Sequence, residues 1–111
     1  MVLGIALFAF TSGKGVKSYI DENSPVMYFY SDKCTHCQAQ APILEELSKE
    51  GYRLKLMDVL AHPEYWAQYS VSGTPTFLAA NGDRQVGFTE KTELRAWLEA
   101  HGARIAQLKA Q

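Results

Sequence analysis

The feature that most constrains the fold of this chain is the alternation of short apolar runs with helical patterns. Residues 26–30 read VMYFY, an apolar and aromatic run that is typical of a central strand. Over residues 35–50, apolar side chains recur at spacings of three and four, which indicates a helix. A strand that is followed by a helix and a second strand favours parallel pairing through a right-handed crossover, so the sequence predicts an α/β domain.

The remaining segments extend this alternation. Further strands are expected over residues 53–58, 76–80 and 83–88, and further helices over residues 16–22, from Pro63, and after a Thr89 cap. Asn81-Gly82 is a hairpin signal, because both turn positions favour a positive φ. The helices are expected to cover both faces of a mixed sheet of four or five strands.

Residues 1–10 read MVLGIALFAF and form the most apolar segment of the chain. The segment is too short to span a bilayer, and no Lys or Arg precedes its apolar run. We expect it to be a buried first strand, and the alternative is the remnant of an export signal or membrane anchor. Residues 1–111 are expected to form a single domain.

Composition excludes several classes of protein. Of the 111 residues, 47% are hydrophobic and 21% are charged, which is typical of one packed domain and not of a disordered chain. The formal net charge of −1 lacks the basic footprint of a nucleic-acid-binding protein, so no nucleic-acid partner is expected. Two cysteines are too few for a disulfide-stapled scaffold.

The two cysteines form the motif Cys34-Thr35-His36-Cys37, which falls where a predicted strand ends and a helix begins. Backbone N–H groups and the positive end of the helix dipole stabilise a thiolate at that point. Cys34 is therefore the expected attacking thiolate, and Cys37, one helical turn later, the thiol that resolves the mixed disulfide. A protonated His36 is expected to lower the pKa of Cys34 and to make the disulfide a better oxidant.

A metal site is the first alternative use of these cysteines. Zinc needs four ligands, or three and a water, and the chain offers the two cysteines with three scattered histidines: His36, His62 and His101. No second C-x-x-C motif is present. We therefore expect no metal and no cofactor beyond the redox-active Cys34–Cys37 pair.

The order of several motifs resembles the thioredoxin superfamily. An aromatic run precedes the C-x-x-C motif, Pro42 lies five residues after the second cysteine, and Gly73-Thr74-Pro75-Thr76 precedes a strand and an Asn-Gly hairpin. The resemblance implies the thioredoxin fold and a thiol–disulfide oxidoreductase activity. It also implies that Pro75 is a cis-proline facing the dithiol, and that the backbone of Thr74 pairs with substrate. Thr35, inside the motif, is counted with these two as substrate-binding.

The chain also departs from the family pattern. Cytosolic thioredoxins carry Trp-Cys-Gly-Pro-Cys, whereas residues 33–37 here read KCTHC. The buried Asp that assists the second cysteine in those proteins aligns with Tyr28, and the nearby Lys aligns with Leu54, so the proton acceptor for Cys37 is unassigned. Because it carries a His before the second cysteine, the motif resembles those of periplasmic disulfide-bond oxidases and of protein disulfide isomerases. We therefore expect a periplasmic or exported protein, with a cytoplasmic one as the alternative.

The resemblance implies protein substrates that carry thiols or disulfides, and a redox partner protein that resets the dithiol. A monomer is expected, because dimeric isomerases of the superfamily pair through an extra domain that this sequence lacks. The net direction of transfer is left open. The alternative function is a non-enzymatic thioredoxin-like adaptor or assembly factor of a secretion or conjugation apparatus, although an adaptor has no need of both cysteines.

Overall fold

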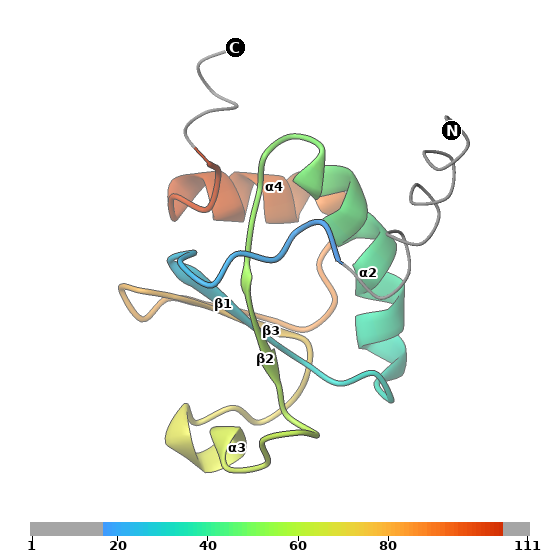
Figure 1. The fold of residues 1–111 in the computed structure, drawn as a ribbon, viewed down its shortest axis with the longest axis vertical. Coiled ribbons are helices and arrows are strands. Elements are labelled where there is room, and N and C mark those ends of the chain that lie inside the picture. Colours follow the sequence, from blue (N-terminus) through green and yellow to red (C-terminus); the bar gives the residue numbers. More distant parts are fainter. Residues whose placement is uncertain (1–16, 106–111) are drawn as a thin grey trace, which may run out of the picture.

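A mixed sheet of four strands in the order β2-β1-β3-β4 is the framework of the computed structural model, which describes residues 17–105 (Figure 1). The elements in chain order are β1 (Val26–Tyr30), α2 (Thr35–Ser48), β2 (Lys55–Asp58), α3 (Tyr65–Gln68), β3 (Thr76–Ala79), β4 (Arg84–Val86) and α4 (Lys91–Ala100). The first strand predicted over residues 1–10 lies outside the described residues.

Strand β1 is central and pairs differently on its two sides. It is parallel to β2, with Tyr28 opposite Leu56, and antiparallel to β3, with Tyr28 opposite Phe77. Strand β4 adds to β3 through the predicted hairpin, in which Gly82 has a φ of +96°. The crossover through α2 and the antiparallel hairpin together confirm the predicted mixed sheet.

Each face of the sheet has its own apolar core, because side chains alternate along the strands. On one face Val26, Tyr28 and Phe77 pack against leucines of α2 and α4. On the other face Phe29, Met57 and Leu78 form a second cluster, which Tyr65 and Tyr69 of the α3 region cover. Figure 1 shows α2 and α4 on one side of the sheet and α3 on the other, as predicted. None of the helices described within residues 17–105 has the length and hydropathy needed to span a membrane.

The prediction of a helix over residues 16–22 is wrong for residues 17–22, which the structure describes. Residues 17–22 form turns around an isolated parallel bridge between Ile20 and Leu54. The N–H of Leu54 donates to the carbonyl of Tyr19 at 2.7 Å, and the N–H of Asp21 donates to the carbonyl of Leu54 at 2.8 Å. This pairing extends the edge of the sheet beside β2 and leaves Tyr19 2% exposed, so tertiary pairing overrides the local helical spacing.

A histidine bridge joins the end of α4 to the β3–β4 hairpin. The Nδ1 atom of His101 lies 2.7 Å from the carbonyl oxygen of Trp97, and its Nε2 atom lies 2.9 Å from a carboxylate oxygen of Asp83. Both partners are acceptors, so both ring nitrogens must carry protons. The hydrogen bond to Asp83, and then the bond to Trp97, raise the pKa of His101, and the same bridge lowers the pKa of Asp83.

We predict that this bridge makes stability depend on pH. The raised pKa of His101 stabilises the fold fully below about pH 6.5, and this contribution is lost as the pH rises through the folded-state pKa. The lowered pKa of Asp83 stabilises the fold above about pH 4, and this contribution is lost as the pH falls. Urea unfolding should therefore show the largest loss of stability in Asp83→Asn between about pH 4 and 6.5. A deficit that stays constant up to alkaline pH would contradict the bridge.

Candidate active site

Cys34 is the N-cap residue of α2, directly after the turn that ends β1. Its backbone is extended, with φ −89° and ψ 118°, and its Sγ atom accepts a hydrogen bond from the N–H of Cys37 at 3.2 Å. The turn is held by two bonds to Ser31, whose carbonyl accepts from the N–H of Cys34 and whose hydroxyl accepts from the N–H of Lys33. The sequence after β1 therefore places a sulfur atom where N-cap residues normally place an oxygen.

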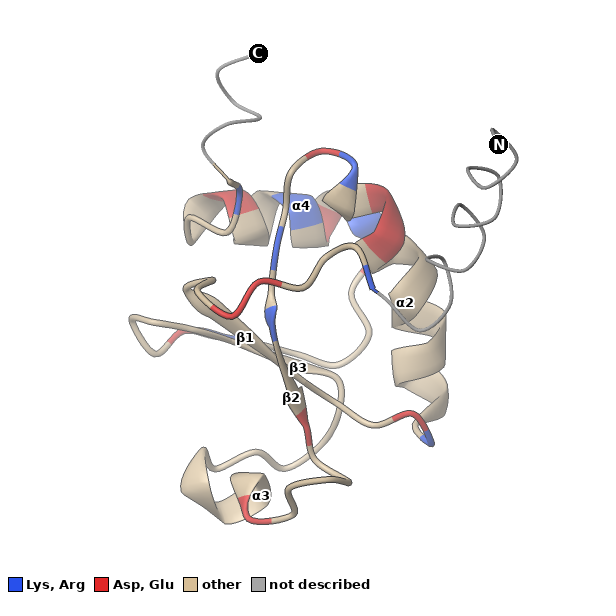
Figure 2. Ribbon diagram, viewed as in Figure 1, with Lys and Arg blue, Asp and Glu red and all other residues tan. Residues whose placement is uncertain are grey.

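The first turn of α2 suits a negatively charged sulfur. It contains no acidic residue, and Figure 2 shows the N-terminal half of α2 without any charged residue. The helix dipole and the free N–H groups of the first turn are therefore unopposed at Cys34. The side chain of Cys34 is half-buried, whereas Cys37 is 4% exposed.

The loop before β3 faces the dithiol, as the resemblance implied. The Sγ atom of Cys34 lies 3.4 Å from the carbonyl oxygen of Thr74, and the Thr74–Pro75 peptide bond is cis. The Thr76 hydroxyl donates to the carbonyl of Gly73 at 2.7 Å, and the N–H of Gly87 donates to the carbonyl of Pro75 at 2.8 Å. The loop is thus fixed from both sides, and Thr74 is left half-buried beside Cys34.

The two thiols have opposite pKa shifts. Burial acts to raise the pKa of Cys34, but hydrogen bonds from Cys37, Thr74 and the backbone of the motif outweigh it and hold the pKa below its usual value. Burial is the main cause that raises the pKa of Cys37 to about 11, and its hydrogen bond to Cys34 adds to this effect. Of the two thiols Cys34 therefore loses its proton first, and a single negative charge on the pair resides on Cys34.

The other two residues of the motif are exposed. Thr35 and His36 occupy the first turn of α2 with their side chains in solvent, and the backbone of His36 contributes a hydrogen bond that lowers the pKa of Cys34. Among residues 17–105, the imidazole of His36 has no hydrogen bond or ion pair. The contribution of His36 that the geometry supports directly is therefore that of its backbone N–H group.

A buried polar pair near the site was not found from the sequence. Gln40 of α2 is 0% exposed; its amide donates to the carbonyl of Thr89 at 3.0 Å, and its oxygen accepts from the N–H of Thr89 at 2.9 Å. The N-cap of α4 is Glu90, and not Thr89 as the sequence predicted. The signal was present in the sequence, because Gln40 lies on the same helical stripe as Cys37, Leu44 and Leu47.

No group of three or more His, Cys, Asp or Glu side chains within the described part of the chain is arranged to hold a metal ion. Two of the histidines that were weighed as alternative metal ligands lie elsewhere. His62 pairs with Glu64 at 3.2 Å, and His101 is engaged in the bridge to Asp83. The structure therefore brings together Cys34, Cys37, Thr74 and Pro75, and leaves both of these histidines in other interactions.

Comparisons with known proteins agree with this arrangement. A family model described as Thioredoxin matches residues 9–100. The chain belongs to the thioredoxin family. A thioredoxin from Rickettsia felis is 28% identical over 90 residues, which cover 74% of this chain and 86% of the relative. A thioredoxin from Buchnera aphidicola is 34% identical over 79 residues, which cover 64% of this chain and 72% of the relative.

Solved structures agree on the fold. A thioredoxin variant from Halobacterium salinarum superposes with a TM-score of 0.61 at 24% identity, over 77% of this chain and 80% of its own. A malaria parasite thioredoxin-2, described as a component of the parasite's protein secretion machinery, has a TM-score of 0.58 at 25% identity, over 68% and 81%. Family membership and the adjacent Cys34 and Cys37 support a general thiol–disulfide oxidoreductase activity.

We predict that alkylation distinguishes the two thiols. Because its pKa is lowered, Cys34 should react with iodoacetamide at a rate that is half-maximal below about pH 8.5, the value for a free cysteine. In Cys34→Ser, the remaining Cys37 should still react only at higher pH than a free cysteine, because burial, the main cause of its raised pKa, is kept. Mass spectrometry of alkylated peptides measures both rates. A Cys34 profile that coincides with free cysteine would contradict the thiolate assignment.

Proposed function

We propose that this protein exchanges disulfides with protein substrates through Cys34 and Cys37. The observation that carries the proposal is the 3.2 Å hydrogen bond from the N–H of Cys37 to the Sγ atom of Cys34, opposite Thr74. The Cys34 thiolate attacks a substrate disulfide, forms a mixed disulfide and releases one substrate thiolate. Cys37 then loses its proton and attacks the Sγ atom of Cys34, which closes the Cys34–Cys37 disulfide and releases the second substrate thiolate.

The substrate is proposed to lie along the loop that contains Thr74 and Pro75. Thr74 is half-buried and its carbonyl faces the reactive sulfur, so an extended substrate segment can pair with this backbone like an added strand. Thr35 is exposed in the first turn of α2 and is proposed to contact the same segment. This mode of binding uses main-chain groups, so it accepts many substrate sequences.

No cofactor is proposed beyond the redox-active cysteine pair, because the pair itself carries both electrons. A redox partner protein is proposed to reset the dithiol after each turnover. We further propose a monomer that works in the periplasm or after export, with an oxidising couple. The argument for the couple is that hydrogen bonds from the motif stabilise the Cys34 thiolate, which favours the reduced form and raises the reduction potential.

A second candidate function is that of a non-enzymatic adaptor in a secretion or conjugation apparatus. The likeness to a malaria parasite thioredoxin-2 that is described as a component of protein secretion machinery favours it. An adaptor of this kind acts through its surface and does not need the dithiol. The two candidates therefore differ in whether the cysteines are required.

Insulin reduction driven by dithiothreitol tests the first candidate. The wild type is expected to turn over, and Cys34→Ser is expected to lose this turnover because no attacking thiolate remains. Cys37→Ser is expected to accumulate a mixed disulfide with the substrate, visible by mass spectrometry and non-reducing gels, because resolution is blocked. Equal rates for the wild type and Cys34→Ser would exclude the enzyme and leave the adaptor.

The reduction potential tests the role of His36. In His36→Pro, the backbone donor and the imidazole are both lost, so the Cys34 thiolate is less stabilised and the potential should fall. His36→Ala is the matched control, because it removes only the imidazole and keeps the N–H. Equilibration with glutathione measures both variants. A potential that is unchanged in His36→Pro would contradict the proposed tuning.

A further inference from the structure

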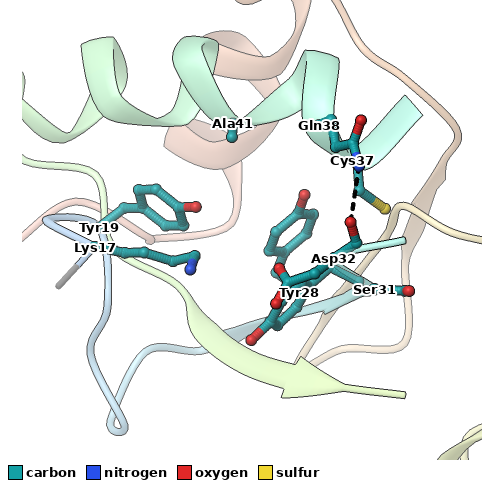
Figure 3. Close-up of a pocket in the computed structure, with 9 residues that line it drawn as sticks. Lys17, Tyr19, Tyr28, Ser31, Asp32, Cys37, Gln38 and Ala41 are labelled. Atoms are coloured by element: carbon teal, nitrogen blue, oxygen red, sulfur yellow. Dashed lines mark hydrogen bonds between the residues drawn. The ribbon is translucent and has the colours of Figure 1, made fainter. Parts of the chain in front are cut away.

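A hollow lies behind the resolving thiol, between α2 and the chain that leads into and out of β1 (Figure 3). Its volume is about 170 Å³, which is room for several water molecules. Its walls are aromatic and polar; the residues are Lys17, Tyr19, Tyr28, Tyr30, Ser31, Asp32, Cys37, Gln38 and Ala41. The hollow therefore gives solvent an approach to Cys37 that does not pass Cys34.

Tyr28 is the aromatic residue of this wall that is most firmly held. Its ring is 2% exposed and stacks on Phe77 at 4.9 Å and on Tyr30 at 5.5 Å between ring centroids. Its hydroxyl has no hydrogen-bond partner among residues 17–105, and Figure 3 shows it directed toward α2. Burial, and then the neighbouring charge of Cys37, raise the pKa of Tyr28, so the phenol keeps its proton. A fixed hydrogen-bond donor thus faces the water space beside Cys37.

The resolving step needs a proton acceptor close to Cys37. Cys37 must lose a proton before it can attack, and its burial opposes the charge that results. The titratable groups around it within the described residues are Cys34 and the side chains that line the hollow: Lys17, Tyr19, Tyr28, Tyr30 and Asp32. Lys17 and Asp32 carry opposite formal charges. Asp32 is the one carboxylate among the residues that line the hollow, and it is exposed, so within residues 17–105 no buried carboxylate stands ready to take the proton of Cys37.

We propose that water in this hollow takes up the proton of Cys37 during resolution, and that the Tyr28 hydroxyl positions this water. This inference rests on the proposed function. Tyr28 is a positioning residue, because it acts through water and keeps its own proton. A water that accepts a hydrogen bond from the phenol has a lone pair left to receive the proton of the thiol, and once that proton has passed to solvent the same water donates a hydrogen bond to the Cys37 thiolate.

The resolving step moves one proton and exchanges one S–S bond for another. The S–H bond of Cys37 breaks and its proton passes to water and then to solvent. The Cys37 sulfur attacks the Sγ atom of Cys34, so the intramolecular S–S bond forms and the bond from Cys34 to the substrate breaks. The electron pair of that bond leaves on the substrate sulfur, which takes a proton from solvent. Two electrons have then passed from the dithiol to the substrate disulfide.

Stopped-flow reaction with the aromatic disulfide dithiobis(nitrobenzoate) tests the proposal, because each step releases one coloured thiolate. The first phase reports attack by Cys34, and the second phase reports resolution by Cys37. Tyr28→Phe keeps the ring and removes only the hydroxyl. Its first phase should match the wild type, whereas its second phase should be about tenfold slower near neutral pH, the effect of about one lost hydrogen bond to a charged group.

The pH profile separates positioning from a structural role. In Tyr28→Phe the rise of the second-phase rate should move to higher pH, because ionisation of Cys37 is less well supported. Tyr19→Phe is the matched control, since it removes a hydroxyl from the end of the hollow that lies beside Lys17 in Figure 3. The second-phase rate of Tyr19→Phe should equal that of the wild type. A second phase in Tyr28→Phe within about twofold of the wild type, with an unmoved profile, would overturn the proposal.

A second pair of variants tests the hollow itself. Ala41→Leu places a larger apolar side chain in the wall and displaces water, whereas Ala39→Leu makes the same change at an exposed position of α2. Only Ala41→Leu should slow the second phase. An unslowed second phase in Ala41→Leu would overturn the route through the hollow.

The failure of this inference is distinguishable from failure of the proposed function. If the wild type shows only the first phase, Cys37 does not resolve and the proposed function fails. If the wild type shows both phases and Tyr28→Phe resolves at the same rate, only the role of Tyr28 fails. Cys37→Ser, which should retain the first phase alone, calibrates both readings.

Discussion

The hydrogen bond from the N–H of Cys37 to the Sγ atom of Cys34 is the contact on which the rest of the site depends. It makes a sulfur atom the cap of α2, so the same contact that begins the helix also stabilises the reactive thiolate. Helix formation and thiol activation are therefore linked. A fold that lost the first turn of α2 would also lose the lowered pKa of Cys34.

The sheet contributes by holding the opposing loop at a fixed distance. Strands β1 and β3 are antiparallel neighbours, so the turn after β1 and the loop before β3 meet at the same end of the sheet. Gly87 holds Pro75 in place from the hairpin, and the buried Gln40–Thr89 pair joins α2 to the segment that follows Gly87. Helix, loop and hairpin are thus tied together around Cys34.

The sequence predicted the parts of this protein that depend on local chemistry. The strand over residues 26–30, the Asn81-Gly82 hairpin and the position of Cys34 at a helix start follow from side-chain patterns and turn preferences. Family resemblance predicted that Thr74 and Pro75 would face the cysteines. Strand boundaries were less accurate, because residues 53–58 shorten to β2 and residues 83–88 shorten to β4.

The errors concern positions whose structure is determined by contacts between residues that are far apart in the sequence. Residues 17–22 have helical spacing, but Tyr19 and Asp21 bond to Leu54 across the sheet edge, and no local pattern encodes that partner. Thr89 has the chemistry of a cap, but its hydroxyl donates to the carbonyl of Gly87 and accepts from the amide of Gln85 instead. The hollow beside Tyr28 is likewise the product of three separated segments. Finally, the 4% exposure of Cys37 has a protective side: exchange with glutathione disulfide or another small disulfide releases one small thiol and leaves the other on the more exposed Cys34. Cys37 can then displace that adduct by attacking the Sγ atom of Cys34, which restores an active cysteine pair.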